Sequence, residues 1–553
     1  LLAVPAGLLA ALGLLRSANV PLRFVFPWGD LAATVLILPS VVYAITWLFA
    51  RRRGERSGPL PLARWILIAA LPLAGSLAHA ERAAPEVSWE PHTGVAFDGS
   101  PLHGDLGRIH VPENRNDPSG RTIEIAFVRY RTDHPDPGPP IFFLAGGPGG
   151  AGTALSGRTA THPQLRLLEH ADVVGIDQRG TGLSRPALTG GADSVEPLPL
   201  DRPVDRADVL AAFRKAAGRR VRVWTERGVD VAAYNTSESA DDLEAVRAAL
   251  GAERIVTFGS SYGSHLGLAH LRRHPEHVAR SVLSRVEGPN HTWKLPSTVQ
   301  RCLERVHAMA GADPAVVRHV PDLLAAVDAL LVRLEAEPVV AEPEREEETR
   351  IVLGPHDLRS ALSRWLATTE GISGIPAAIH RFGNGDWTRL ARFAREERRV
   401  WVDAMPLLMD CASGGTAERR ARIERERRDP ATLLSDALMA PFYPEACAAC
   451  PEADLGEAFR RGFSCDVPVL FVSGVLDPRT PPENVEEIRA GFPNSAHLRV
   501  ENAGHEAREL MSEEFRDLMQ SFLRGEEVRS CTIRLPPVQF EPIEAENRAV
   551  PGS

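Results

Sequence analysis

A short segment at residues 255–263 constrains the fold of this chain more than any other stretch. Its first four residues are apolar or β-branched, its last five are Gly-Ser-Ser-Tyr-Gly, and a helix-patterned segment follows as far as Arg273. A Gly-x-Ser-x-Gly sequence between a buried strand and a helix holds its serine on a strained turn, and the glycines let neighbouring backbone approach closely. The segment therefore predicts a strand, a sharp turn and a helix, with Ser261 at the turn. The alternative is a coincidental Gly-Ser turn, because the bare motif is common.

The composition is that of a large globular protein without a strong charge bias. The chain has 553 residues, of which 44% are hydrophobic and 24% charged, and its formal net charge is -9. This length suffices for one large domain with a substantial insertion and an N-terminal extension. The charges form no basic face in the sequence, so nucleic acid is not an expected partner.

The N-terminal region contains two apolar segments of different kinds. Residues 31–50 form an uncharged apolar run that is long enough to cross a bilayer, and the arginines at 51–53 favour a cytoplasmic end. Residues 65–80 have a short apolar core and end in Ala-His-Ala, as an export signal cleaved after Ala80 would. Two interpretations stay open: a protein anchored in the membrane by this region, or a secreted protein whose true start lies near residues 51–64. Both place the protein outside the cytoplasm, in the periplasm or the extracellular space, whereas a soluble buried helix is the alternative for residues 31–50.

The cysteines agree with an oxidising compartment. Cys447 and Cys450 have the spacing of a redox or zinc motif, but the sequence offers no second pair with suitable spacing. We therefore expect structural disulfides in the inserted segment, and neither a metal nor a cofactor. The six cysteines are Cys302, Cys411, Cys447, Cys450, Cys465 and Cys531.

A glycine-rich loop follows one of the predicted buried strands. Residues 104–111 and 122–130 predict an antiparallel pair, and the apolar run at 140–144 then predicts a strand buried on both faces. The loop after such a strand lies beside the turn at Ser261, so its backbone can supply an N–H group to an oxyanion. We assign that donor to Gly147, with the N–H of Tyr262 as the second donor. A flexible loop and a phosphate-binding loop are the alternatives, and the second lacks the Gly-Lys-Ser/Thr ending.

The remaining pattern predicts a mostly parallel sheet with a large helical insertion. Strands are predicted near residues 172–177, 279–286, 467–474 and 497–500, and helix-period segments dominate residues 292–463. An insertion of this size would lie as a cap over the carboxyl edge of the sheet, where ligands bind. The predicted divisions are an N-terminal transmembrane or signal region (1–80), the first part of the core (81–291), the cap (292–463), the second part of the core (464–530) and a C-terminal tail (531–553).

Asp477 and His505 follow successive predicted strands, on the sheet edge that also carries Ser261. A serine hydroxyl is a weak nucleophile at neutral pH, so it needs a histidine to accept its proton and later return it. A carboxylate then fixes the imidazole tautomer and stabilises its protonated form. We therefore expect Ser261, Asp477 and His505 to act together, although a lone histidine in such a loop is more often a surface residue.

These residues resemble the α/β-hydrolase peptidases that include prolyl iminopeptidases and bacterial tripeptidyl aminopeptidases, over residues 95–525. The resemblance predicts an α/β-hydrolase fold and shares the chain order Ser, Asp, His. At Ala145 the chain departs from prolyl iminopeptidases, which commonly have a histidine there, and this favours the tripeptidyl branch. The cap residues Ile375, Pro376, Ile379, Gly385, Asp386 and Trp387 also resemble that branch. The matching motifs are residues 146–150, 177–184, 240–243, 259–263 and 474–481, with Gly504 and His505.

The resemblance implies an exported serine aminopeptidase that acts on peptides with a free N-terminus, whose ammonium group acidic side chains hold. Glu287 is the candidate anchor for that ammonium group, although a carboxylate there can equally cap a helix or pair with an arginine. Two other functions stay open. One is a carboxylic ester hydrolase or lipase that uses the same three residues, and the other is a non-catalytic binding protein tethered to the membrane.

Overall fold

The computed structural model describes residues 85–543, except for residues 118, 189–194, 344, 346–348, 435–446 and 449–453. The chain divides into two compact units, Leu1–Ala83 and Ala84–Ser553. The predicted transmembrane or signal region at 1–80 lies outside the described residues, as does Cys450. Within the described ranges, none of the helices combines the length and the apolar character needed to cross a bilayer.

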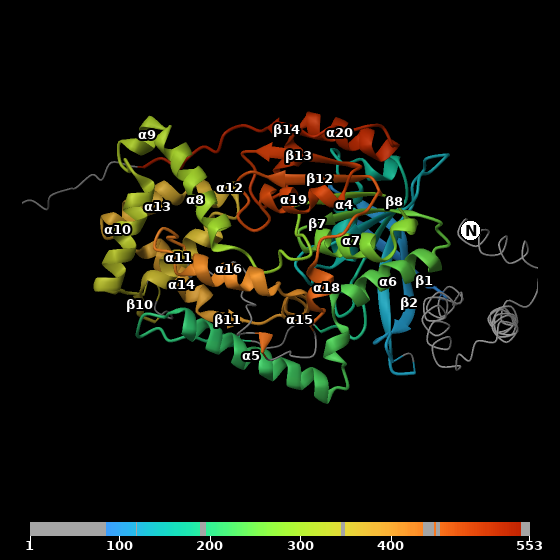
Figure 1. The fold of residues 1–553 in the computed structure, drawn as a ribbon, viewed down its shortest axis with the longest axis horizontal. Helices are drawn as coiled ribbons and strands as arrows, with labels where there is room; N and C mark the ends of the chain where they lie inside the picture. The colour runs from blue at the N-terminus through green and yellow to red at the C-terminus, as the bar shows by residue number, and fades with distance from the viewer. Residues whose placement is uncertain are drawn as a thin grey trace, which may run out of the picture. The chain divides into compact units, whose positions relative to one another are not determined.

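A ten-stranded sheet forms the core of the second unit (Figure 1). The pairs β1–β2, β2–β3 and β3–β5 are antiparallel, and all the other pairs in the sheet are parallel. The strands lie in the order β1 (Ser88–Val95), β2 (Pro101–Pro112), β3 (Thr122–Tyr130), β5 (Val173–Ile176), β4 (Ile141–Leu144), β7 (Ile255–Ser260), β8 (Val278–Ser284), β12 (Val469–Gly474), β13 (Ser495–Glu501) and β14 (Cys531–Arg534).

Helices cover both faces of this sheet because its central strands are apolar on both sides. In β4, for example, Phe142 and the neighbouring Phe143 belong to different apolar clusters. The Phe142 cluster includes residues of α6 (Thr236–Ala249) and α7 (Tyr262–Arg273), and the Phe143 cluster includes residues of α4 (Gly152–Ala160) and α20 (Glu513–Arg524). Near-continuous apolar strands are typical of parallel sheets with helices on both faces. The prediction of an α/β fold with a mostly parallel sheet is therefore confirmed.

Two strands of the sheet lie in segments where the sequence pattern predicted none. β1 falls between the predicted N-terminal region and the first predicted strand, and most of its residues are exposed. β14 falls at the start of the predicted tail and pairs with β13 at the edge of the sheet. Edge strands bury few side chains, so their hydrophobic alternation is weak.

Most of the segment between β8 and β12 is helical and forms a cap with an apolar core of its own (Figure 1). Residues before Ser261 also contribute to the cap, since β6 (Val195–Pro197) pairs with β11 (Arg399–Trp401) and α5 (Arg206–Glu226) packs beside them. A second small sheet joins β9 (Val339–Ala341) to β10 (Ile351–Leu353). The helices between β8 and β12 are α8 (Pro296–Gly311), α9 (Pro314–Val317), α10 (Leu323–Ala336), α11 (Pro355–Trp365), α12 (Thr369–Ser373), α13 (Ile375–Gly383), α14 (Thr388–Glu397), α15 (Ala404–Ser413), α16 (Ala417–Arg427) and α18 (Gly456–Arg460), and α19 (Pro482–Ile488) follows β12.

A disulfide and a buried ion pair tie parts of the cap together. Cys411 of α15 is bonded to Cys447, which confirms the expectation of a disulfide in the inserted segment. The guanidinium of Arg398 pairs with Asp357 at 2.7 Å, and the two side chains are only 2% and 3% exposed. Arg398 also donates hydrogen bonds to the carbonyl oxygens of Pro199 and Val352, each at 2.7 Å. One buried arginine thus joins three segments that are far apart in the sequence.

We expect the Arg398→Ala variant to lose about 3–5 kcal/mol of unfolding free energy, because it leaves the carboxylate of Asp357 buried without its partner. Urea denaturation followed by tryptophan fluorescence measures this loss. Arg399→Ala is the matched control, since Arg399 is the exposed neighbour, and its change should stay within about 0.5 kcal/mol. Equal losses in the two variants would contradict the role given to Arg398.

Candidate active site

The turn between β7 and α7 holds Ser261 in a strained backbone conformation. Ser261 has φ 55° and ψ -126°, and a residue other than glycine in this region costs about 1–3 kcal/mol. Its N–H donates a hydrogen bond of 3.0 Å to the carbonyl oxygen of Ser284 at the end of β8. The predicted strand, sharp turn and helix are therefore confirmed, with Ser261 at the turn.

Close backbone packing requires the glycines around this turn. A methyl group at Gly263 would lie 2.0 Å from the carbonyl oxygen of Leu144, and one at Gly259 would lie 2.3 Å from the carbonyl oxygen of Gly263. A methyl group at Gly146 would lie 2.9 Å from the carbonyl oxygen of Ser260. These distances are shorter than van der Waals contact, so a side chain at Gly263 or Gly146 would push β4 and the loop after it away from the turn, and a side chain at Gly259 would push the start of α7 away from β7.

The loops after β7, β12 and β13 bring Ser261, Asp477 and His505 together. The hydroxyl of Ser261 donates to Nε2 of His505 at 3.1 Å, and Nδ1 of His505 donates to Oδ2 of Asp477 at 2.8 Å. The three strands are parallel, so their carboxyl ends meet at one edge of the sheet. This geometry allows His505 to take the proton of Ser261 while Asp477 holds the imidazole in place.

Asp477 is fully buried and accepts several hydrogen bonds. Its Oδ1 accepts from the backbone N–H groups of Arg479 and Thr480 at 2.8 and 2.9 Å, and its Oδ2 accepts from the hydroxyl of Thr480 at 2.6 Å. Burial alone would raise the pKa of Asp477, but His505 and Thr480 together hold this pKa well below its usual range. Asp477 is therefore ionised when it receives the hydrogen bond from His505.

The cap holds the loop that carries His505. The backbone N–H of His505 donates to the carbonyl oxygen of Ala367 at 2.7 Å, just after α11. The next residue, Glu506, accepts a hydrogen bond of 2.7 Å from the hydroxyl of Thr369 at the start of α12. The imidazole is thus positioned both by the sheet and by the cap.

Gly147 and Tyr262, the two residues that the sequence predicts as oxyanion donors, both lie next to Ser261. Gly147 lines the cavity that contains Ser261, and its φ of 125° is one that glycine adopts readily. Tyr262 is the first residue of α7, so its N–H has no acceptor within the helix. The side chain of Tyr262 turns away into the core, where its hydroxyl lies 3.0 Å from that of Thr236. The role of Gly147 and Tyr262 as the two oxyanion donors stays a prediction.

The cavity at Ser261 has a volume of about 270 Å³ and contains several charged side chains. Glu287 lines it, but its carboxylate is already paired with the ammonium group of Lys294. Burial would raise the pKa of Glu287, and the charges of Lys294 and His265 bring it below its ordinary value instead. Glu287 is therefore an ionised partner of Lys294 inside the cavity.

The other titratable residues of this cavity were not predicted from the sequence: Lys294, Arg364, Asp403, Asp410 and Arg479. Asp410 comes from α15 of the cap, and burial raises its pKa well above the ordinary value, with Glu287 adding to the effect. Arg479 follows Asp477 by two residues. Its place beside the predicted acid was a signal that could have singled it out, whereas nothing in the sequence places α15 over Ser261.

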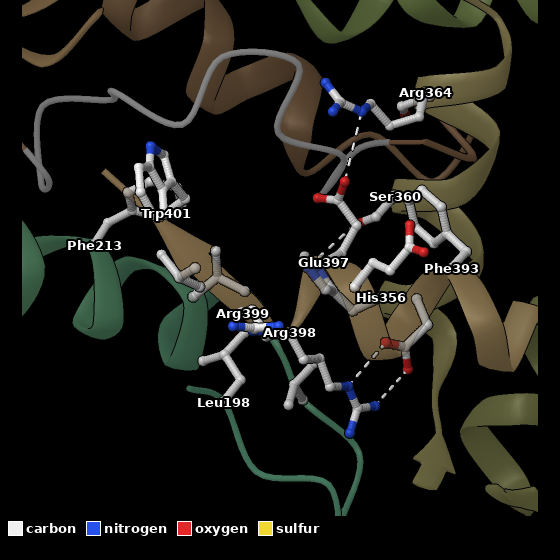
Figure 2. Close-up of a pocket in the computed structure, with 16 residues that line it drawn as sticks. Leu198, Phe213, His356, Ser360, Arg364, Phe393, Glu397, Arg398, Arg399 and Trp401 are labelled. Atoms are coloured by element: carbon white, nitrogen blue, oxygen red, sulfur yellow. Dashed lines mark hydrogen bonds and ion pairs between the residues drawn. The ribbon is translucent and has the colours of Figure 1, made fainter. Parts of the chain in front are cut away.

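A second cavity of about 320 Å³ lies within the cap (Figure 2). Its lining includes the Arg398–Asp357 ion pair, together with Phe393 of α14 and Trp401 of β11. Trp401 and Arg364 of α11 line both cavities, so the two are neighbours. Figure 2 shows Arg364 directed toward Glu397, with 3.6 Å between Nε and Oε1.

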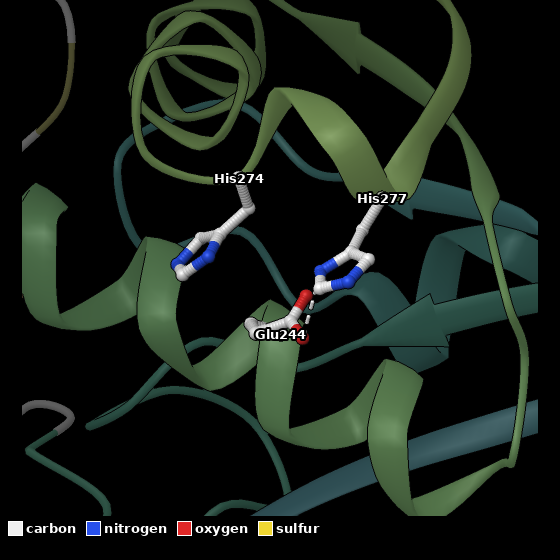
Figure 3. A group of neighbouring side chains, drawn as sticks. All are labelled: Glu244, His274 and His277. Carbon is white, nitrogen blue, oxygen red and sulfur yellow. Dashed lines mark ion pairs between the residues drawn. The ribbon is translucent and has the colours of Figure 1, made fainter. Parts of the chain in front are cut away.

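Glu244, His274 and His277 form a cluster whose possible metal-binding atoms lie within 4.8 Å of one another (Figure 3). The carboxylate of Glu244 and the imidazole of His274 already have protein partners. Glu244 accepts hydrogen bonds from Arg247 through both carboxylate oxygens, and Nε2 of His274 is 2.9 Å from Asp241. The cluster lies at the end of α7 opposite Ser261, which is about 18 Å for twelve helical residues. We interpret it as an ion-pair network that joins α6 to α7.

Comparison with known proteins agrees with this geometry. The chain is 31% identical over 222 residues to the serine protease Hip1 of Mycobacterium tuberculosis (strain ATCC 25618 / H37Rv), and this match covers 37% of the chain and 40% of Hip1. It is 28% identical over 225 residues to the tripeptidyl aminopeptidase of Streptomyces coelicolor (strain ATCC BAA-471 / A3(2) / M145), with 39% and 40% covered. It is also 28% identical over 253 residues to carboxylesterase B of the same M. tuberculosis strain, with 43% and 47% covered.

These matches span less than half the length of each curated relative. The model of the alpha/beta hydrolase fold family matches residues 139–509, from the start of β4 through the loop that carries His505. The parallel strands from β4 to β13, the turn at Ser261 and the hydrogen-bonded residues Ser261, His505 and Asp477 all lie within that match. The chain belongs to the alpha/beta hydrolase fold family.

Proposed function

We propose that this protein is a serine hydrolase that releases N-terminal residues or short peptides from peptide substrates. The observation that carries the proposal is the continuous hydrogen-bonded series from Ser261 through His505 to the buried carboxylate of Asp477. The N–H groups at Gly147 and Tyr262 supply the donors that acyl transfer requires beside such a serine. The names of the relatives, a serine protease and a tripeptidyl aminopeptidase, support a peptide substrate.

The reaction proceeds in two acyl-transfer steps. The oxygen of Ser261 attacks the peptide carbonyl while His505 takes its proton, and the two backbone N–H groups stabilise the resulting oxyanion. The C–N bond then breaks, His505 gives the proton to the leaving amine, and an ester remains on Ser261. A water molecule attacks this ester with His505 as the base, which releases the acid and restores the serine.

The ammonium group of the substrate binds beside Asp410 and Glu287 in this proposal. Lys294 neutralises Glu287, so Glu287 alone is a weak anchor for a second cation. The carboxyl of Asp410 makes no hydrogen bond to any residue in the described ranges, and a bound ammonium group would favour its ionised form. The anchor is therefore the pair of carboxylates, with Asp410 as the unpaired member.

The Ser261→Ala variant should lose at least about 10³-fold in kcat/KM on chromogenic aminoacyl or tripeptidyl substrates, because no other group can form the acyl-enzyme. A fluorescent phosphonate probe should label the unmodified protein and not this variant. Ser260→Ala is the matched control, since the neighbouring hydroxyl bonds to Arg285 rather than to His505. Turnover or labelling that survives in Ser261→Ala would refute the proposal, and an unlabelled natural protein would favour a non-catalytic binding protein.

Acetylation of the substrate's N-terminus should lower kcat/KM by about 10- to 100-fold, because it removes the charge that Asp410 and Glu287 bind. In the Asp410→Asn variant the free and acetylated peptides should be cleaved at more similar rates, whereas the exposed control Asp466→Asn should keep the difference. Hydrolysis of each peptide pair followed by mass spectrometry measures both effects. A preference for free amines that Asp410→Asn leaves intact would place the anchor elsewhere.

An esterase is the second candidate function, because carboxylesterase B is among the relatives and the same three residues hydrolyse esters. Simple p-nitrophenyl esters compared with peptides of the same acyl group decide between the two. Ester turnover without any peptide turnover would replace the peptidase by an esterase and leave the role of Ser261 unchanged.

We further propose that the protein is exported and associates with the membrane through its N-terminal region. The uncharged run at residues 31–50 and the Ala-His-Ala sequence ending at Ala80 support this, and the Cys411–Cys447 disulfide is typical of an oxidising compartment. In cells that express the whole chain, we expect the protein in the periplasmic, membrane or extracellular fraction. If the signal is cleaved, intact-mass measurement should find an N-terminus at Glu81. Accumulation only in the cytoplasm would contradict export.

A further inference from the structure

The guanidinium group of Arg479 makes no hydrogen bond or ion pair to any described residue around the cavity that contains Ser261. Arg479 lies in the turn after β12, and its side chain lines the cavity. Its Nε is shielded from solvent, and among the described residues no acceptor bonds to any nitrogen of its guanidinium group. A guanidinium group keeps its charge at any physiological pH, and a buried donor without an acceptor is costly. An acceptor atom on a bound ligand would supply the hydrogen bond that Nε of Arg479 lacks.

The other two cations of the cavity are already paired. Lys294 binds Glu287, and Arg364 lies 3.6 Å from Glu397 on α14, as Figure 2 shows. Burial lowers the pKa of Arg479 and the charge of Arg364 acts in the same direction, whereas the charges of Asp477 and Glu397 act in the opposite direction. The guanidinium groups of Arg479 and Arg364 repel each other. An anion between them would relieve this repulsion and supply the missing acceptors.

Arg479 lies in the turn that positions His505, and it lines the cavity that contains Ser261. Its backbone N–H bonds to Asp477, and the hydroxyl of the next residue, Thr480, is 3.2 Å from Nδ1 of His505. The turn that carries Arg479 is therefore the turn that positions His505. Because His505 must give its proton to the leaving nitrogen, the leaving group passes next to this imidazole.

We infer that Arg479, assisted by the charge of Arg364, binds a carboxylate on the residue that the enzyme releases from the C-terminal side of the cleaved bond. Either the α-carboxylate of a short peptide or the side chain of an aspartate or glutamate provides this chemistry. The inference rests on the proposed peptidase function and gives it a substrate class. Asp410 offers an unpaired carboxyl to the ammonium end and Arg479 offers an unpaired cation to the carboxylate end, so one cavity selects short zwitterionic peptides.

Four versions of one cleaved peptide test the inference, with the same acyl part and different released residues. The released residue is glycine, glycinamide, the α-amide of glutamic acid or glutaminamide. We expect kcat/KM for at least one carboxylate-bearing version to exceed that of its amide partner by about 10- to 100-fold, mainly through KM. Glycine against glycinamide reports an α-carboxylate, and the glutamic acid amide against glutaminamide reports a side-chain carboxylate.

The Arg479→Gln variant should reduce this ratio to about one, and Arg479→Lys should retain part of it, because lysine keeps the charge but not the paired donors. Arg529→Gln is the control, since Arg529 is an exposed arginine at 87% exposure, and it should keep the full ratio. Circular dichroism and phosphonate labelling of each variant establish that its fold and Ser261 are intact. A ratio near one in the natural protein, or a ratio that Arg479→Gln leaves unchanged, would overturn the inference.

A failure of the peptidase proposal is distinguished from a failure of the carboxylate subsite by the use of esters. If no peptide is cleaved but esters are, the same comparison uses esters of 4-hydroxybenzoate and 4-hydroxybenzamide, in which the leaving group does or does not carry a carboxylate. A preference for the 4-hydroxybenzoate ester that Arg479→Gln removes would keep the carboxylate subsite in an esterase. Equal rates on the two esters would reject the subsite as well.

Discussion

The structure depends on how closely the backbone of β4 approaches the start of α7. The carbonyl oxygen of Leu144 lies where a side chain at Gly263 would be, and the carbonyl oxygen of Ser260 lies where one at Gly146 would be. This contact forces the sharp turn at Ser261 and at the same time brings the Gly147 loop beside it. The nucleophile and one of its proposed oxyanion donors are therefore products of a single packing constraint. Asp477 and His505 reach the same edge because β12 and β13 continue the sheet in parallel on the far side of β8.

Much of this core could be predicted from the sequence, because its determinants are local. The apolar run at β7 followed by Gly-x-Ser-x-Gly fixes a strand, a turn and a helix within a few residues of one another. Asp477 and His505 each follow a short buried strand, and parallel strands end at the same edge. The weak alternation of β1 and β14 explains why these edge strands were not predicted. Their pairing depends on neighbours that the local pattern does not reveal.

The cap residues of the candidate site could not be predicted in the same way. Asp410 reaches the cavity because α15 packs over the sheet, and that packing depends on contacts between segments separated by more than a hundred residues, such as the hydroxyl pair of Thr236 and Ser413 at 3.2 Å. The role of Glu287 also changes once its partner is known. A carboxylate after β8 suggests a free anchor, whereas Lys294, seven residues later, already neutralises it. Charge in this cavity is therefore set by pairing rather than by the number of acidic residues.

The hydrogen bond from the backbone of His505 to the carbonyl oxygen of Ala367 has a consequence for how molecules enter and leave. A lid that lifted away as one rigid piece would carry this carbonyl with it and withdraw the support of the general base. Movements of the cap that leave residues 367–369 in place would instead keep the imidazole of His505 supported. The support of the general base is thus shared between the sheet and the inserted segment.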